Sequence, residues 1–249
     1  MWTALALASE FRPIAGEAWR VVESQSRVAT MKLVDSLAEQ QVLEAELERS
    51  KPAIPIACQH LHWLLATPFR YAPYPHGSRF RRARQRDGCL YAAERIDTAI
   101  AEDAFYRLRF HLDAPGVALP RNPVERTAFS FRAKTSAGLD LTNPPLDRDR
   151  SVWTHPSDYA PCQTLADAGR TAGAALLRYT SVRDHAHGAN WAVLDCAAIS
   201  TRTPTRQQTW HYMIRSTQIE AVCEMPQMSL VFPYAAWASA DPRIPQQLA

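Results

Sequence analysis

The sequence predicts a single compact α+β domain with mixed or antiparallel sheets and flanking helices, preceded by a helical extension at the N-terminus. Short apolar segments typical of strands gather in the second half of the 249-residue chain, and they do not alternate regularly with helices as in a doubly wound sheet. The sequence contains neither a GxGxxG nor a GxxxxGKS/T loop. A bound nucleotide would therefore be held by side chains and not by a glycine-rich loop.

The N-terminal segment, residues 16–50, predicts one long amphipathic helix that ends at Lys51, Pro52 and Pro55. We therefore divide the chain into a helical extension, residues 1–55, and a main domain, residues 56–249. The candidate apolar face of this helix consists of Trp19, Val22, Val28, Met31, Val34, Leu37, Val42 and Leu47.

The main domain begins with a short apolar strand at residues 88–92, followed by a helix at residues 98–110. Residues 127–133 alternate between apolar and polar side chains and favour a strand, whereas residues 136–151 favour a loop. A helix is expected over residues 156–173. Further strands are expected at residues 175–182, 191–196, 208–215 and 219–223.

The composition, with 47% apolar and 21% charged residues, is that of a globular protein. The sequence has no run of about 18 apolar residues, so we expect no membrane span. The net charge of +3 is too small to argue for nucleic acid from the whole surface. The N-terminus lacks a basic leader, so we expect a cytoplasmic protein. The five cysteines are scattered and form no CxxC pair, which favours buried, reduced thiols.

Two histidine pairs, His60 with His62 and His185 with His187, have a spacing that places both rings on one face of a strand. No third ligand is evident near either pair, so we expect no metal site.

Five arginines fall between residues 79 and 86. Such a run suits either a nucleic-acid surface or one wall of a pocket for a phosphorylated small molecule. Planar guanidinium groups bind phosphates in a bidentate manner, so one or two of these arginines would suffice for the pocket.

An ordered set of short motifs resembles the RES-domain family, named for an arginine, a glutamate and a serine. The motifs are Phe69-Arg70-Tyr71, Gly77-Ser78-Arg79-Phe80, Leu90-Tyr91-Ala92-Ala93-Glu94, Thr98-Ala99-Ile100-Ala101-Glu102 and Tyr179-Thr180-Ser181-Val182-Arg183-Asp184. The resemblance implies an NAD+-degrading toxin of a toxin–antitoxin pair, with a fold similar to that of ADP-ribosyltransferases. It also implies a cognate Xre-like, helix-turn-helix antitoxin that blocks access to the site.

By this resemblance, Glu102, Arg79 and Ser181 are the catalytic candidates. Residues matching the family's substrate-binding positions are Arg70, Tyr71 and Tyr91, and Arg82 is a further candidate. The family's Gly-Gly-Arg-Trp-Asn motif is altered in this sequence to Gly-Ser-Arg-Phe-Arg, which leaves open whether Arg81 or Arg82 takes the part given to Arg79.

The chemistry of NAD+ cleavage also fits one carboxylate. The bond joins ribose to a pyridinium nitrogen, so nicotinamide departs neutral and needs no proton. Ordinary glycoside cleavage uses two carboxyl groups, one of them an acid for the leaving oxygen. Here Glu102 alone would stabilise the positive charge that grows on the ribose.

The sequence therefore predicts an NAD+ glycohydrolase or phosphorylase that uses NAD+ as substrate and holds no cofactor. Whether water or phosphate attacks, whether NADP+ is accepted, and whether the chain forms a homodimer remain open. The alternatives are an ADP-ribosyltransferase that acts on a macromolecule, a catalytically silent domain, and a nucleic-acid-binding module. Otherwise nucleic acid is expected only through the antitoxin.

Overall fold

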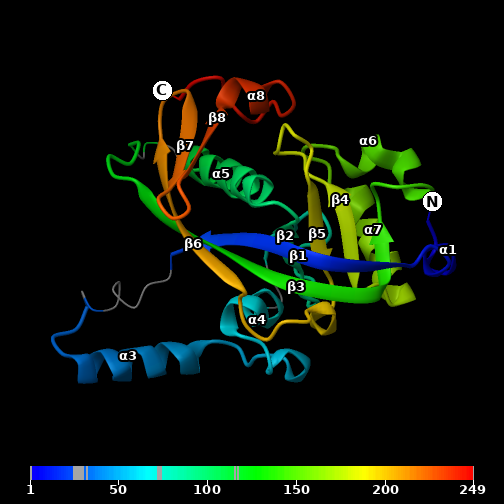
Figure 1. Cartoon of the computed structure of the whole chain (residues 1–249), viewed down its shortest axis with the longest axis horizontal. Helices are drawn as coiled ribbons and strands as arrows, with labels where there is room; N and C mark the ends of the chain where they lie inside the picture. Colours follow the sequence, from blue (N-terminus) through cyan, green and yellow to red (C-terminus); the bar gives the residue numbers. More distant parts are fainter. Residues whose placement is uncertain are drawn as a thin grey trace.

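A computed structural model describes residues 2–24, 31, 33–71, 75–114, 116 and 118–248. The architecture is a mixed sheet of eight strands with flanking helices (Figure 1). The strands are β1 (Arg12–Glu23), β2 (Leu90–Ala93), β3 (Val124–Asp140), β4 (Leu176–Thr180), β5 (Ala189–Val193), β6 (Arg206–Ile214), β7 (Gln218–Cys223) and β8 (Met228–Pro233).

The strand order is β1-β2-β5-β4-β3-β6-β7-β8, and β1 also pairs with β3. Since β1 pairs at both of its edges, β1, β2, β5, β4 and β3 close into a ring of strands. All pairings are antiparallel except that of β3 with β4. Figure 1 shows β1 and β3 running side by side across the middle of the molecule.

The close contact of β1 with β3 depends on Gly138. A Cβ atom at this position would lie 2.6 Å from the side chain of Ile14 on β1. Any larger residue would push the two strands apart, which explains a glycine inside a long strand.

The helices cover different parts of the sheet. Helix α5 packs Ile100, Phe105 and Leu108 against the C-terminal strands, in a core that includes Trp210 and Tyr212. The helices are α1 (Ala4–Ala8), α3 (Leu37–Ser50), α4 (Trp63–Arg70), α5 (Ile96–Leu112), α6 (Arg150–Trp153), α7 (Ala160–Ala172) and α8 (Tyr234–Ala238), with short 3-10 turns η1 (Ile56–Cys58), η2 (Leu146–Asp149) and η3 (Cys196–Ala198).

The prediction of one helix over residues 16–50 is wrong in its first part. Residues 12–23 form β1, which pairs with β3 from Arg12↔Gly138 to Glu23↔Arg126. This pairing joins residues more than a hundred positions apart, and such tertiary contacts override local periodicity. In the later part of this range the described residues contain α3, while residues 25–30 and 32 lie outside the described residues. The boundary expected at residue 55 thus leaves one strand of the common sheet on its N-terminal side.

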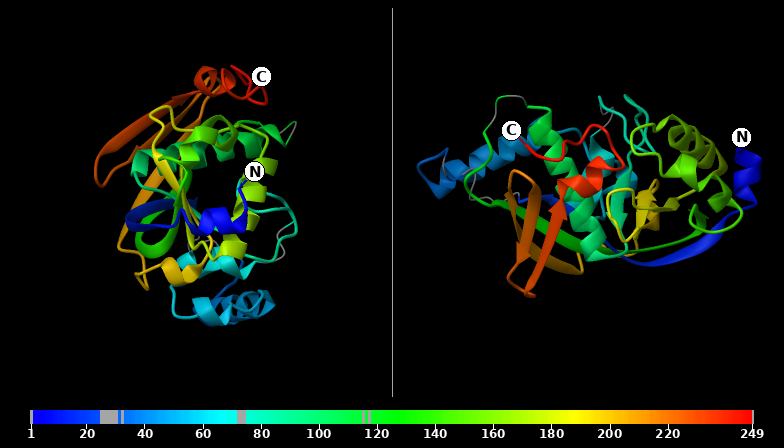
Figure 2. Two further views of the ribbon diagram at one scale, coloured as in Figure 1. Left: turned by 90° about the vertical axis from the view of Figure 1, so that its right-hand side faces the viewer. Right: turned by 90° about the horizontal axis from the view of Figure 1, so that it is seen from above.

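Helix α3 lies apart from the sheet, beside α4 (Figure 1). The right-hand view of Figure 2 places α1 and α3 at opposite ends of the molecule.

The other predicted elements are largely confirmed. Helices α5 and α7 and strands β2, β4, β5, β6 and β7 lie where the sequence predicts them, within a few residues. The loop predicted at residues 136–151 is wrong at both ends, because β3 extends to Asp140 and the segment then forms η2 and α6. In the described ranges, no helix combines the length and apolar character needed to span a membrane.

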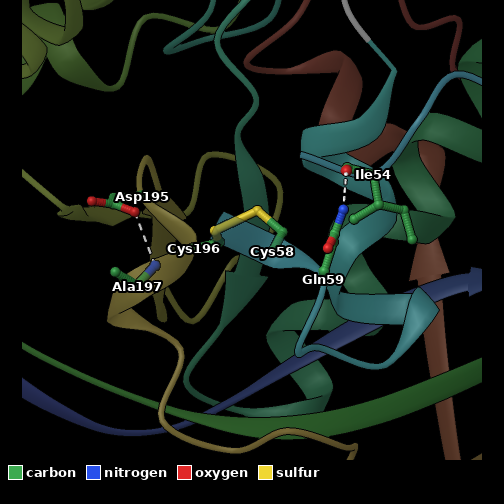
Figure 3. The surroundings of a disulfide bond; sticks show 6 residues. All are labelled: Ile54, Cys58, Gln59, Asp195, Cys196 and Ala197. Carbon is green, nitrogen blue, oxygen red and sulfur yellow. Dashed lines mark hydrogen bonds between the residues drawn. A yellow bond between two sulfur atoms is a disulfide. The ribbon is translucent and has the colours of Figure 1, made fainter. Parts of the chain in front are cut away.

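The expectation of reduced thiols is wrong for one pair of cysteines. Cys58 and Cys196 form a disulfide that joins η1 to η3 (Figure 3). The two residues are 138 positions apart, and the fold brings them together beside the Asp195 cap, which accepts a hydrogen bond from the Ala197 N–H at 2.9 Å. Cys89, Cys162 and Cys223 are free and buried, as expected.

Candidate active site

A cavity of about 330 Å³ lies between α5, residues of β1, β2, β4 and β5, and the loop at residues 77–79. Aromatic and charged side chains dominate its walls. The lining residues are Trp19, Arg20, Val21, Gly77, Ser78, Arg79, Tyr91, Ala92, Ala93, Ala99, Glu102, Asp103, Tyr106, Tyr159, Tyr179, Val182, Arg183 and Asn190.

Glu102 enters this cavity from α5. Ala99 and Tyr106 lie three and four residues from it and share its face of the helix, and the neighbouring Asp103 also lines the cavity, while the opposite face packs into the core. The Oε1 atom of Glu102 accepts hydrogen bonds from Ser181 Oγ at 2.6 Å and from Asn190 Nδ2 at 2.7 Å. Two donors on one oxygen fix the carboxylate, while Oε2 accepts no hydrogen bond within the described part of the chain.

Ser181 follows β4 and is fully buried. Its Oγ donates to Glu102 and accepts hydrogen bonds from the N–H groups of Arg183 and Asp184, at 3.2 and 3.1 Å. The two backbone donors leave the hydroxyl hydrogen of Ser181 directed at Glu102, so Ser181 helps to fix the position of the carboxylate.

Tyr91, on β2, lines the cavity and contacts Ser78 and Phe80. Its hydroxyl accepts a hydrogen bond from the Phe80 N–H at 2.9 Å and lies 2.8 Å from Ser78 Oγ. Burial raises the pKa of Tyr91 well above its usual value, so the phenol stays neutral.

Arg79 lines the cavity from the loop and is 7% exposed. Its Nη1 donates to the carbonyl oxygens of Trp153 and His155, at 2.8 and 3.0 Å, and its guanidinium lies 4.7 Å from the centre of the Tyr159 ring. Among the described residues it forms no ion pair, so its charge is not neutralised by a carboxylate.

Arg20 is a cavity residue that the sequence analysis missed. Its Nη1 donates to the Tyr91 carbonyl at 2.8 Å, and its buried Nε has no partner among the described residues. Burial lowers the pKa of the Arg20 guanidinium below its usual value. Arg20 and Arg79 therefore form two guanidinium groups in one cavity that no carboxylate of the described chain pairs within 4 Å.

Three predicted site residues do not reach the cavity. Arg70, at the end of α4, donates to Glu48 Oε1 of α3 at 2.6 Å and to the Pro52 carbonyl. Tyr71 is 39% exposed. The structure thus brings together four of the predicted residues, Arg79, Tyr91, Glu102 and Ser181, and leaves out Arg70, Tyr71 and Arg82.

The arginine run from residue 79 to 86 has several different environments. Arg79 and Arg81 are buried, and Arg82 binds Asp167 at 2.5 Å and Thr164 at 3.0 Å. Only Arg79 of this run lines the cavity, so the run does not form one continuous phosphate-binding surface.

Asp103 is the second carboxylate at the cavity, and it is neutralised. Arg126 donates to its two oxygens at 2.8 and 2.5 Å. Glu102 forms no ion pair in the described ranges, and it is therefore the carboxylate whose charge is available to a ligand.

Tyr159 lines the cavity and lies close to both Arg79 and Arg183. Burial alone would raise its pKa, but the charges of Arg183 and Arg79 and hydrogen bonds with Tyr106 and Arg183 lower it below the usual value.

The C-terminal segment holds Arg183 in place. Arg183 Nη1 forms an ion pair with Asp241 at 3.1 Å, and Trp237 donates to the Arg183 carbonyl at 2.8 Å. Asp241 is fully buried and also binds Arg243 at 2.6 Å.

We expect Asp241→Asn to lower the free energy of unfolding by about 2 kcal/mol at pH 7. Burial alone would raise the pKa of Asp241, but hydrogen bonds from Arg243 and the charges of Arg243 and Arg183 lower it from 3.8 to about 2. A depressed folded-state pKa stabilises the fold above pH 4, and this contribution is lost as the pH falls towards 2. Denaturant unfolding of both proteins from pH 7 to pH 2 checks this: the difference should shrink on acidification, and a constant difference would contradict it.

No group of three or more His, Cys, Asp or Glu side chains in the described residues could hold a metal ion. His60, His62, His185 and His187 are thus not parts of such a group.

The fold and the cavity define a mixed α+β protein whose pocket contains one carboxylate and two guanidinium groups that form no ion pair with the described residues. The model of the RES domain matches residues 54–215, and the chain belongs to this family. A chain of the crystal structure of the M. tuberculosis MbcT-MbcA toxin-antitoxin complex is similar at 11% identity, with a TM-score of 0.47, over 95% of this chain and 95% of that chain. None of the curated proteins matches.

Proposed function

We propose that this protein cleaves the bond between nicotinamide and ribose in NAD+ and serves as the toxin of a toxin–antitoxin pair. The observation that carries the proposal is the unpaired Glu102 carboxylate, held by Ser181 and Asn190 in the same cavity as Arg20 and Arg79. Membership of the RES-domain family supports the toxin role and an ADP-ribosyltransferase-like fold.

Glu102 supplies the electrostatic part of the reaction. As the bond to nicotinamide lengthens, positive charge develops on the ribose, and a fixed carboxylate stabilises that charge without reorganising. The leaving nicotinamide is neutral, so no acid is required, which agrees with a cavity whose other carboxylate, Asp103, is paired with Arg126.

Arg20 and Arg79 supply the binding of the diphosphate. Burying a guanidinium without a counter-ion is unfavourable, and a bound anion removes that cost. Both side chains keep donors in planar groups suited to phosphate oxygens. In this proposal, Arg20 takes the part that the sequence analysis gave to Arg70.

The aromatic walls orient the substrate. Tyr91, Tyr106, Tyr159 and Tyr179 surround the cavity and offer flat faces to the nicotinamide ring. Burial raises the pKa of Tyr179 well above its usual value, so it too remains a neutral phenol. Water or phosphate then attacks the ribose from the open side.

The identity of the second product tests the reaction. NAD+ labelled in its adenylate moiety is incubated with the purified chain, with and without phosphate, in the presence of a cell extract. We expect all label in free ADP-ribose or its 1-phosphate. Label retained on protein or nucleic acid would instead identify a transferase.

The toxin role is tested in cells. Expression of the wild-type chain is expected to deplete NAD+ and stop growth, and co-expression of an antitoxin that covers the cavity is expected to restore both. Growth arrest with unchanged NAD+ would contradict this part of the proposal.

A further inference from the structure

Asn190 is the second side chain, besides Ser181, that donates to Glu102. It lies on β5, is 2% exposed and lines the cavity. Its register partners are Tyr179 on β4 and Ala93 on β2, which also line the cavity. Asparagine is a poor strand former, so its place in a central strand suggests a role for its polar groups.

The orientation of the Asn190 amide is fixed by chemistry. A carboxylate accepts hydrogen bonds and does not donate them, so the atom 2.7 Å from Glu102 Oε1 must be the amide nitrogen. The remaining Oδ1 is therefore an acceptor. It is buried and finds no donor among the described residues.

A buried acceptor without a partner is unfavourable, and such groups in native proteins call for an explanation such as an unseen ligand. A donor that reaches Asn190 Oδ1 would lie close to the Glu102 carboxylate, because the nitrogen of the same amide binds Glu102. In the proposed reaction, this carboxylate faces the ribose carbon that loses nicotinamide. The hydroxyl on the neighbouring carbon of the same ribose is the nearest donor that the substrate carries.

We propose that Asn190 Oδ1 accepts a hydrogen bond from the 2′-hydroxyl of the nicotinamide ribose and makes the site specific for ribosides over 2′-deoxyribosides. This inference rests on the proposed function. Positive charge on the ribose makes the hydroxyl a stronger donor, so the bond strengthens as the reaction proceeds. Asn190 thus has two roles: its nitrogen positions Glu102, and its oxygen contacts the substrate.

The test compares NAD+ with its analogue carrying 2′-deoxyribose on the nicotinamide side. For each substrate, kcat/KM is divided by the uncatalysed rate, because deoxyribosides are intrinsically more labile. We expect the wild-type protein to prefer NAD+ by about 100-fold, since a site built to bind a hydroxyl rejects the analogue that lacks it. In Asn190→Leu, we expect this preference to fall below about fivefold, whatever the loss of rate.

Ser181→Ala is the matched control. It removes the other donor to the same oxygen of Glu102 but keeps the Asn190 acceptor. We expect it to lower kcat on both substrates and to keep the preference. Asn190→Ala serves as a second variant if the leucine protein does not fold.

The outcomes separate the two proposals. Wild-type cleavage of NAD+ with the same preference in the Asn190 variants would overturn the role of Asn190 and leave the proposed function standing. Loss of the preference in Ser181→Ala as well would show that the position of Glu102, and not Asn190 Oδ1, sets it. Folded wild-type protein that releases no nicotinamide would overturn both proposals.

Discussion

Glu102→Gln is expected to lower kcat for nicotinamide release by about 10²- to 10³-fold, the loss typical of one removed electrostatic contact to a developing charge. The glutamine side chain keeps the size of the glutamate and can still accept hydrogen bonds from Ser181 and Asn190 through its carbonyl oxygen. Only the negative charge is lost. KM should therefore change little, since the charge acts on the ribose mainly as the bond breaks. Steady-state kinetics at saturating NAD+ measures the effect.

The control for this variant is Glu46→Gln on α3. Glu46 is 56% exposed and, of the residues that the structure describes, forms an ion pair with Arg49, at 2.7 Å. Its substitution removes one carboxylate far from the cavity and should leave kcat unchanged. Equal losses in the two variants, or full activity in Glu102→Gln, would contradict the role given to Glu102.

Arg20→Met is expected to raise KM for NAD+ by about 10- to 100-fold, because one charged hydrogen-bond donor to the diphosphate is lost. The methionine side chain retains apolar contacts along β1 and removes the buried charge. Since that charge is unpaired within the described residues, its removal should not destabilise the fold. Initial rates over a range of NAD+ concentrations, with a thermal unfolding curve beside them, give both quantities.

Arg70→Met tests the competing assignment. Arg70 is paired with Glu48 and lies outside the cavity, so its loss should change KM by less than about threefold. A large effect of Arg70→Met with none of Arg20→Met would restore the role that the motif comparison gave to Arg70.

Some residues of the cavity can be predicted from local sequence, and others cannot. Glu102 and Tyr91 lie on consecutive elements, β2 and α5, whose spacing can be recognised locally. Ser181 follows a short apolar strand, and its motif marks it in the same way. For these residues, local sequence is enough to place the side chain in the site.

Arg20 could not be found by such reasoning. Arg20 reaches the cavity because β1 pairs with β3 and β2. The residues around position 20 do not indicate either partner strand. The apolar residues near it recur in a way that suits a helix as well as a strand. The one available signal was the Trp19-Arg20-Val21-Val22 stretch, where aromatic and β-branched residues favour a strand.

Arg70 lies outside the cavity for a related reason. It follows Pro68 at the end of α4, and this helix turns its last residue toward α3. The disulfide between Cys58 and Cys196 has the same origin, since only the complete fold brings η1 beside η3. Long-range contacts of this kind determine much of the structure of the N-terminal part of this protein.

Release of nicotinamide from NAD+ by the purified chain tests the central claim most directly. We predict continuous release over many turnovers, with one nicotinamide formed for each NAD+ consumed, by a site in which Glu102 and Arg20 act together. Intact NAD+ after prolonged incubation with protein shown to be folded, both with and without phosphate, would contradict it.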